Sequence, residues 1–378
     1  MNQNYPALYV EINRNEYIFI VSDIADDDNY KIIYFKKIPI KGIVNNKIQD
    51  LNLVTTIIKE NIYLAEQKTN YTFKEAILII NNFTCSSISL SGFKKLNGIQ
   101  LSKDHVSHLL NSIKTNINEI ETKKKIIHIF NSKFFLDNKE IENMPIGLFG
   151  NFYSQEIFFY LIDNNDHKNL KVLFDRCNLR IKRILSKNFL EGAHIAKNNL
   201  NSEIFFKIRI DKTNTEIFYF ENLSLKFFQT FKFGTDLIIN DISKIIALDV
   251  EKVKDIIINS DFSKKNIEND LIEKRFFIEQ NFRKIKKKLV NDIADARIHE
   301  IIDLVILNNI NLKSFVKKKL TIFIEVCDQP NFKSFRNCYE KSFAKFNNIE
   351  LKFIENFQNN DFNDIVNTIV QYGWKNEA

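Results

Sequence analysis

Glycine and proline are scarce in this chain, with 8 Gly and 4 Pro among 378 residues. Enzymes that hold phosphates usually need clustered glycines, because a backbone without Cβ lets N–H groups approach the anion closely. The two glycines nearest to each other in the sequence are Gly147 and Gly150. The sequence therefore excludes a P-loop and a GxGxxG dinucleotide fingerprint.

Cysteine is also rare, and the four residues Cys85, Cys177, Cys327 and Cys338 form no CxxC pair. This spacing argues against a disulfide framework and against a zinc site, and it favours a reducing compartment. No stretch approaches the roughly 18 apolar residues that a membrane span requires. The first residues lack the basic segment of a signal peptide. We therefore expect a cytoplasmic protein that binds no metal.

Charge of one sign is not in large excess, since Lys+Arg 54 stand against Asp+Glu 47 and the formal net charge is +7. Lysine-rich runs occur at 123–125, 283–288 and 317–319. We interpret them as solvated helix faces and loop ends, because no nucleic-acid-binding module accompanies them. No nucleic-acid partner is expected. Polyanion binding is an alternative that rests on the charge alone.

Apolar periodicity predicts a similar order of elements in both halves of the chain. The first half is expected to contain strands at 8–24, 31–38, 76–80, 86–90, 124–135, 155–162 and 181–185 and helices near 53–64, after Ser102, at 167–177 and at 189–197. The second half begins again with three strands over 204–233. Helices over 237–309, a buried strand at 320–326 and helices near 332–346 and 365–370 follow. This order predicts a duplicated α/β unit with a different insertion in each half.

Several segments, in the same order along the chain, resemble the bacterial actin-like cell-division protein family FtsA. They are IPIKGIVNNKIQD at 38–50, a helix ending in Ala65-Glu66, ISLSGFKKLNG at 88–98, MPIGLFG at 144–150, the helix around Cys177, FKFGTDLIINDIS at 231–243, LVNDIADARIHEIIDLV at 289–305 and TIVQYG at 368–373. No single motif is diagnostic. Their order and spacing together make the resemblance specific over nearly the whole chain.

The resemblance implies an α/β fold of the actin, Hsp70 and ribonuclease H type, with an SHS2-type 1C insertion in the first half and a helical 2B insertion in the second. The implied subdomains are 1A at 1–83 and 164–199, 1C at 84–163, 2A at 200–234 and 313–378, and 2B at 235–312.

The family binds ATP and Mg²⁺ with three turns, and all three differ here. The family's D-I-G-T-S turn corresponds to EINRN at 11–15, its D-I-G-G-G-T-T-D turn to RIDKTNTE at 209–216, and its T-G-G turn to Ile324-Glu325-Val326. The residues at the degenerate nucleotide site are Glu11, Asn13, Arg14, Arg209, Asp211, Lys212, Thr213, Glu216, Gly234, Glu325 and Val326.

These substitutions change the chemistry of the implied site. Asn13, Lys212 and Thr213 would obstruct a phosphate nest, because glycine permits positive φ and close backbone approach. Arg209 reverses the charge of a carboxylate that would organise the Mg²⁺ shell. We expect no bound cofactor, no enzyme activity, and a cleft filled by side chains, because an empty one would leave buried polar groups unsatisfied. For Gly234 and Asp236, a turn residue and a helix N-cap are the expected roles.

The family's 2B subdomain receives the acidic and apolar C-terminal tail of the tubulin-like protein FtsZ. The residues that would bind this tail are Arg297, Glu300, Arg283, Lys286 and Lys287, because a cluster of cations attracts an acidic peptide. An ordinary i,i+3 ion pair between Arg297 and Glu300 is the alternative interpretation.

Family members continue past the Tyr-Gly segment to an amphipathic membrane-targeting helix, whereas five residues follow Gly373. We therefore expect no direct membrane insertion. The function implied is a non-enzymatic adaptor linking FtsZ to the divisome at the cytoplasmic face of the inner membrane, with the 1C block contacting other division proteins or a second copy. The alternatives are a scaffold of type IV pilus assembly and an actin-fold ATPase.

Overall fold

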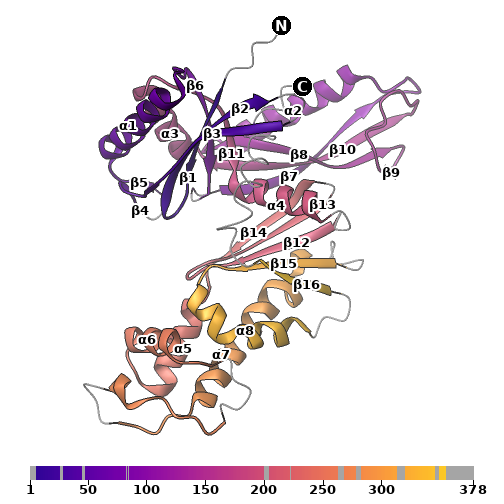
Figure 1. The fold of residues 1–378 in the computed structure, drawn as a ribbon. Coiled ribbons are helices and arrows are strands. Elements are labelled where there is room, and N and C mark those ends of the chain that lie inside the picture. Colours follow the sequence, from indigo (N-terminus) through magenta and orange to yellow (C-terminus); the bar gives the residue numbers. More distant parts are fainter. Residues whose placement is uncertain are drawn as a thin grey trace. The chain divides into compact units, whose positions relative to one another are not determined.

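The computed structural model describes residues 6–25, 29–44, 47–81, 83, 85–199, 204–221, 223–262, 268–277, 282–312, 320–344 and 349–354. The chain divides into two compact units. The first contains Met1–Leu200 with Leu223–Lys226, and the second contains Asn201–Asn222 and Phe227–Asn359. Each unit contains its own five-stranded sheet (Figure 1).

The main sheet of the first unit has the strand order β11-β6-β1-β2-β3. Its strands are β1 (Ala7–Ile12), β2 (Glu16–Ala25), β3 (Asn29–Pro39), β6 (Glu75–Ile80) and β11 (Arg180–Ser186). β1 lies parallel to β6 and β6 to β11, whereas β1, β2 and β3 form an antiparallel meander. The last five residues of β1 and of β6 are all buried, as expected of strands covered on both faces.

Two helices cover this sheet with their apolar sides. α1 (Leu51–Thr69) begins at Asp50, whose side chain accepts a hydrogen bond from the Leu53 N–H, and it packs against α3 (Asn164–Arg176). The short strands β4 (Ile43–Val44) and β5 (Lys47–Ile48) precede α1, and α4 (Lys187–Asn198) follows β11 directly.

The predicted single strand over 8–24 is wrong, because the structure divides it into β1 and β2. The two strands pair antiparallel, with Ile12 opposite Tyr17. The polar residues Asn13, Arg14 and Asn15 form the turn between them. The apolar pattern on both sides concealed this turn, which contains neither Gly nor Pro.

Between β6 and α3 the chain forms a separate four-stranded sheet with the order β7-β10-β8-β9. Its elements are β7 (Cys85–Lys95), α2 (Lys103–Ile120), β8 (Lys124–Leu136), β9 (Lys139–Ile141) and β10 (Phe152–Asp163). Ser102 caps α2 as predicted, in a reciprocal capping box with His105. A Cβ at Gly92 would lie 2.5 Å from the Ile113 Cδ1, so α2 packs directly on β7.

The sheet of the second unit has the order β14-β13-β12-β15-β16. Its strands are β12 (Ile204–Ile210), β13 (Thr215–Glu221), β14 (Ser224–Phe231), β15 (Leu320–Val326) and β16 (Ile349–Phe353). As in the first unit, a three-strand meander is followed by two parallel strands on the side of the first strand. The duplication predicted from the sequence is therefore confirmed.

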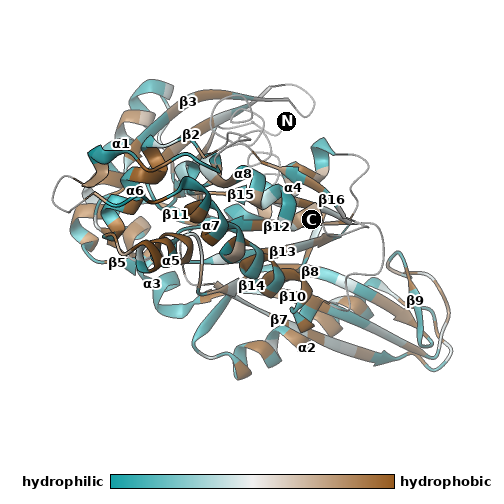
Figure 2. Ribbon diagram, turned by 90° about the horizontal axis from the view of Figure 1, so that it is seen from below, coloured by the Kyte–Doolittle hydropathy of each residue, from teal (hydrophilic) through white to brown (hydrophobic). Residues whose placement is uncertain are grey.

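Helices fill the connection between β14 and β15, as the sequence predicted. They are α5 (Asp236–Ile246), α6 (Val250–Asn259), the 3₁₀ turn η1 (Lys274–Phe277), α7 (Lys287–Ile302), the π-helical turn η2 (Asp303–Leu307) and the 3₁₀ turn η3 (Ile310–Leu312), and α8 (Gln329–Ala344) follows β15. α5 is mostly apolar (Figure 2) and buries Ile238, Ile239, Ile242 and Ile246. The predicted helix at 365–370 lies outside the described residues, and the subdomain boundaries stay predictions.

None of the helices in the described parts of the chain is both long and apolar enough to cross a membrane.

A histidine joins the inserted sheet to the main sheet of the first unit. His128 on β8 accepts a hydrogen bond from the backbone N–H of Ser186 to its Nε2 at 2.8 Å, and its ring packs against Phe130 and Phe189. Ser186 is the last residue of β11 and the N-cap of α4. Burial, assisted by the nearby Arg183 charge, lowers the pKa of His128 to about 3. The neutral imidazole therefore holds the start of α4 in place.

The histidine predicts a stability that depends on pH. Because the folded-state pKa of His128 lies below the ordinary value of 6.5, its contribution is complete above that pH and is lost as the pH falls toward 3. Between pH 7.5 and pH 5 this loss is about 2 kcal/mol of unfolding free energy. We expect His128→Gln to remove this part of the pH dependence in urea unfolding, and His108→Gln on the exposed side of α2 to retain it. An unchanged slope in His128→Gln would contradict the assignment.

Candidate functional site

The turn between β1 and β2 is closed by the side chain of Asn13. Its Oδ1 accepts hydrogen bonds from the backbone N–H groups of Asn15 and Glu16, both at 2.9 Å, and its Nδ2 donates to the Glu11 Oε1 at 3.0 Å. Asn13 and Glu11 are buried, and Arg14 is partly buried at the tip. The amide side chain therefore uses turn N–H groups that a glycine at this position would leave available to a phosphate.

Glu11 carries an internal counter-ion. The Nζ of Lys187, the first residue of α4, forms an ion pair with the Glu11 Oε1, and only 3% of the glutamate side chain is exposed. Glu11, the first residue of the segment that the resemblance equates with a phosphate turn, is thus bonded to a lysine and an amide of the same unit. Mg²⁺ binds through oxygen ligands and retains several waters, and the lysine charge opposes a cation here.

The turn between β12 and β13 is also closed from within. The Asp211 N–H donates to the Asn214 carbonyl and the Lys212 N–H to the Asp211 Oδ1, both at 2.8 Å. Thr213 lies at the tip of this turn. Neither turn contains any of the residues with positive φ. Both turns therefore avoid the left-handed conformation that glycine would permit.

Gly234 allows this second turn to lie against the start of α5. A Cβ at Gly234 would be 2.0 Å from the Asp211 carbonyl oxygen, a distance that no side chain tolerates. The N–H groups of Thr235 and Asp236 donate to the carbonyls of Asp211 and Lys212, each at 2.9 Å. We expected Asp236 to be the N-cap of α5, but the N-cap is Thr235. The Thr235 hydroxyl donates a hydrogen bond to the Asp328 Oδ2. The first amides of α5 are thereby occupied by the turn.

Arg209 lies between two carboxylates in the sheet. In register it faces Glu216 on β13 and Glu325 on β15. The Arg209 Nε is 4.0 Å from the Glu325 Oε2 and also donates to the Cys327 Sγ at 3.2 Å. Lys207, two residues earlier on the same face and fully buried, has its Nζ 3.6 Å from the Glu325 Oε2. Two cations and two carboxylates thus form a cluster of no net charge, which we call the Arg209 cluster.

The third segment implied by the resemblance is not a turn. Ile324, Glu325 and Val326 are the last residues of β15, and Val326 is buried in the core opposite Ile210. The chain bends only after the strand, at Cys327 and Asp328. The substitutions that place Arg209 and Glu325 in two different family motifs are therefore linked, because the two residues lie opposite each other on neighbouring strands.

The described residues contain no group of three or more His, Cys, Asp or Glu side chains arranged to hold a metal ion. The polar groups described at the two turns mostly bond to partners within their own unit. Glu325 differs, because its buried Oε2 accepts no hydrogen bond from the described residues and is held by the ion pairs with Lys207 and Arg209.

Arg297 connects two helices of the second unit. Its Nε donates to Asp241 on α5, and its Nη1 donates to the Glu300 Oε2 at 2.6 Å. The hydrogen bond with Asp241, followed by the charges of both carboxylates, raises the pKa of Arg297. Two carboxylates of the same unit already neutralise this guanidinium, so the structure supports the ion-pair interpretation and extends it to Asp241.

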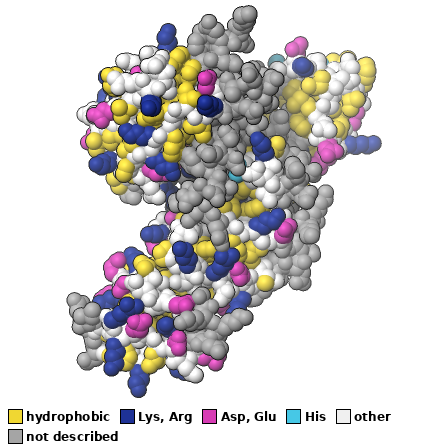
Figure 3. Space-filling view, in the orientation of Figure 1, with side chains coloured by type: hydrophobic (Ala, Val, Ile, Leu, Met, Phe, Trp, Pro, Cys, Tyr) yellow, Lys and Arg dark blue, Asp and Glu magenta, His cyan; other side chains and the backbone are white. Residues whose placement is uncertain are grey.

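The basic run 283–288 does not form one helical face, because α7 begins at Lys287. Arg283 donates to the Ala247 carbonyl at 2.7 Å, which closes the end of α5. Lys287 lies 4.0 Å from Asp270 and Lys288 lies 3.0 Å from Glu268. Lys284 and Lys286 are exposed. Positive and negative side chains are accordingly interspersed over this block in Figure 3.

The two five-stranded sheets have the same strand order, and in each sheet a candidate phosphate turn connects the first two strands. This topology is that of an actin-like fold, and the α/β fold class predicted from the sequence is confirmed. A chain of a solved "PilM-PilN type IV pilus biogenesis complex" superimposes with a TM-score of 0.56 at 7% identity, covering 94% of this chain and 90% of that one. No protein-family model matches the sequence.

Within the actin-like class, the sequence is similar to cell division protein FtsA. FtsA of Buchnera aphidicola subsp. Acyrthosiphon pisum is 22% identical over 353 residues, which are 89% of this chain and 82% of the relative. FtsA of Buchnera aphidicola subsp. Baizongia pistaciae is also 22% identical, over 88% of this chain and 81% of the relative. The chain thus has an actin-like fold and a sequence that is similar to FtsA over 89% of its length.

Sequence reasoning missed two residues of the site, Lys187 and Lys207. Lys207 gave a signal, because a lysine in the apolar strand FFKIRI requires a buried acidic partner. Lys187 gave none, since its partner Glu11 is 176 positions away in the sequence.

The Arg209 cluster predicts strong energetic coupling between β12 and β15. We expect Glu325→Gln to lower the unfolding free energy by about 3 kcal/mol, because it leaves the charges of Lys207 and Arg209 buried without this carboxylate. In a double-mutant cycle with Arg209→Gln, measured by urea unfolding, the coupling should be about 1–2 kcal/mol. Glu350→Gln, which breaks an exposed pair with Lys352, serves as the control and should cost below about 1 kcal/mol. Additive effects in the cycle would contradict the pairing.

Proposed function

We propose that this chain is an FtsA-like adaptor of bacterial cell division that links FtsZ to other division proteins without hydrolysing ATP. Similarity to FtsA over nearly nine-tenths of the chain supports the biological context. The observation that carries the non-enzymatic part is the internal pairing of both turns. Asn13 and Lys187 satisfy Glu11, and Arg209 is paired with Glu325.

The same contacts support the proposal that no nucleotide binds. A phosphate entering the first turn would have to displace the Asn13 side chain from two backbone N–H groups. In the second turn, Arg209 replaces a metal-organising carboxylate and is held beside Glu325. Each displacement would leave a buried polar or charged group without its partner, which costs about 1–3 kcal/mol per group.

The FtsZ tail is the proposed partner of the helical block. Around Lys284 and Lys286, the exposed side chains include Phe282 and Leu289, so cations alternate with apolar groups. An acidic and apolar peptide matches this mixture in both charge and hydrophobicity. We name residues 282–289 the basic-apolar segment. Arg297 and Glu300 support its scaffold by joining α5 to α7.

The inserted four-stranded sheet is the proposed contact for other division proteins or a second copy. Phe93 is 69% exposed and Phe149 71% exposed, with Phe152 nearby in sequence on β10. Large apolar side chains at such exposure commonly mark interaction surfaces. Recruitment by these partners would place the protein at the cytoplasmic face of the inner membrane at the division site.

A second candidate function is a scaffold of type IV pilus assembly. It is favoured by the fold similarity to the chain from the PilM–PilN complex, which covers 94% of this protein. This candidate predicts no affinity for an FtsZ tail, so one binding experiment separates the two.

The adaptor proposal predicts saturable binding of the labelled FtsZ C-terminal peptide from the same organism, measured by fluorescence anisotropy. Lys284→Glu combined with Lys286→Glu should weaken binding tenfold or more, equal to about 1.4 kcal/mol, because it reverses two exposed charges. The matched control combines Lys333→Glu with Lys341→Glu on exposed positions of α8 and should bind like the parent. Absence of binding by the folded parent would favour the pilus-type scaffold.

A further inference from the structure

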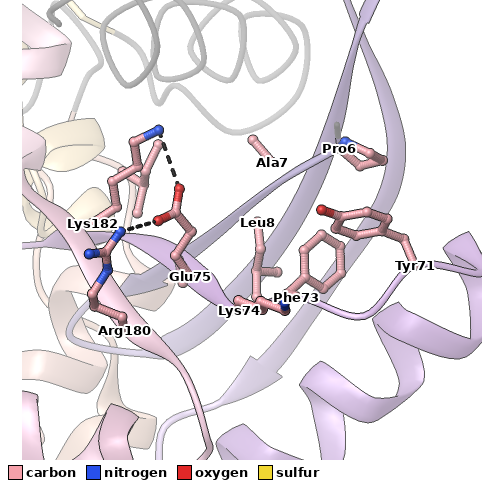
Figure 4. A pocket seen from close by; sticks show the side chains of 11 residues that line it. Pro6, Ala7, Leu8, Tyr71, Phe73, Lys74, Glu75, Arg180 and Lys182 are labelled. Atoms are coloured by element: carbon pink, nitrogen blue, oxygen red, sulfur yellow. Dashed lines mark hydrogen bonds and ion pairs between the residues drawn. The ribbon is translucent and has the colours of Figure 1, made fainter. Parts of the chain in front are cut away.

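A cavity of about 540 Å³ opens in the first unit at the end of the sheet opposite the Asn13 turn. It is formed where β1, β6 and β11 begin, whereas the turn follows the last residue of β1. Figure 4 shows the two sides of this cavity. One side carries Tyr71, Phe73 and Pro6, and the other carries Arg180, Lys182 and Glu75.

The apolar side is a preformed wall. The rings of Tyr71 and Phe73 meet edge to face with centroids 5.1 Å apart. The Phe73 N–H donates a hydrogen bond to the Glu66 Oε1 at 2.9 Å, which fixes the segment after α1. Leu8 at the start of β1 continues this wall and is buried. A ligand side chain placed here would meet mainly aromatic and aliphatic carbon, with the Tyr71 hydroxyl as a polar group in the same wall.

The polar side of the cavity is basic, and the carboxylate of Glu75 positions two of its cations. The Glu75 Oε2 accepts a hydrogen bond from the Arg180 Nη2 at 2.8 Å, and the Glu75 Oε1 lies 3.3 Å from the Lys182 Nζ. These interactions, that of Arg180 being the largest, lower the pKa of Glu75. A register shift between Ile181 and Arg183 makes Lys182 an extra residue of β11. Such a bulge redirects a side chain, here toward Glu75.

The exposed cations of the cavity lining can pair with an acidic group of a ligand. Besides Arg180, the described lining includes the exposed cation Lys74. The Arg180 side chain is 77% exposed, so most of its N–H donors face solvent. None of the described residues that line the cavity holds a buried polar atom without a partner. Sites for small metabolites usually fix orientation through such placed polar groups, whereas rim charges beside an apolar wall suit side chains of a peptide.

We propose that this cavity binds a short segment of a partner protein in which an aromatic or aliphatic side chain lies close to an acidic one. The apolar side chain contacts Tyr71, Phe73 and Leu8, and the carboxylate pairs with Arg180. Glu75 positions both cations and competes with the incoming carboxylate. This site is separate from the basic-apolar segment of the helical block and does not depend on the partner proposed there.

The test uses an array of eight-residue peptides in which Asp stands one to three positions from Phe, Leu or Trp, together with copies in which Asn replaces Asp. The best peptides are then labelled and titrated by fluorescence anisotropy with the full chain. We expect Asp peptides to bind and Asn copies to bind at least tenfold more weakly. Arg180→Ala should lower affinity tenfold or more, since a charged hydrogen bond is lost. Arg176→Ala on exposed α3 is the matched control and should bind like the parent.

Glu75→Gln separates ligand binding from a structural role. Because it removes the competing carboxylate, we expect it to tighten binding of the Asp peptides severalfold, while Asp175→Asn, an exposed control, should not. No saturable binding by the parent or by Glu75→Gln would overturn the proposal. Binding confined to phosphatidylglycerol vesicles and weakened by Arg180→Ala would also overturn it, in favour of a lipid headgroup. A phenylpropionate affinity equal to that of the peptides would assign the cavity to small acids instead.

Discussion

In both hairpin turns, polar groups form hydrogen bonds with partners within the chain. In an actin-like fold these turns follow the first strand of each sheet, where strand ends would leave N–H groups directed at a bound phosphate. Here the Asn13 side chain takes two such N–H groups in the first turn. In the second, Asp211 and Asn214 close the turn and its carbonyls bind the first amides of α5.

Charge balance extends this internal pairing into the sheets. Lys187 neutralises Glu11 in the first unit, and Arg209 is placed between Glu216 and Glu325 in the second. A carboxylate-to-arginine change alone would bury an unmatched charge, which is costly. Glu325 on the neighbouring strand offsets part of that cost, because its Oε2 lies 4.0 Å from the Arg209 Nε and 3.6 Å from the Nζ of the buried Lys207. Gly234 fits this picture as a packing requirement, since any side chain there would collide with the turn.

The sequence predicted the repeated order of strands and helices because apolar runs and periodicity are local properties. The central strands β6, β12 and β15 and the cap at Ser102 were all visible in this way. Apolar periodicity did not predict the β1–β2 turn, because the turn contains no glycine. The side chain of Asn13 closes it instead. The partners of the site were not predictable, because pairing Arg209 with Glu325 or Glu11 with Lys187 requires strand order and register between residues more than a hundred positions apart.

The central claim is that internally satisfied turns replace nucleotide in this actin-like protein. It is tested most directly by thermal unfolding of the full chain with and without about 5 mM Mg-ATP, with a nucleotide-binding actin-fold ATPase as positive control. A ligand with a dissociation constant of about 50 μM would add about 2.7 kcal/mol at that concentration and raise the midpoint by a few degrees. The account predicts no change in midpoint beyond that caused by matched salt. A rise that grows with ATP concentration and requires Mg²⁺ would contradict it.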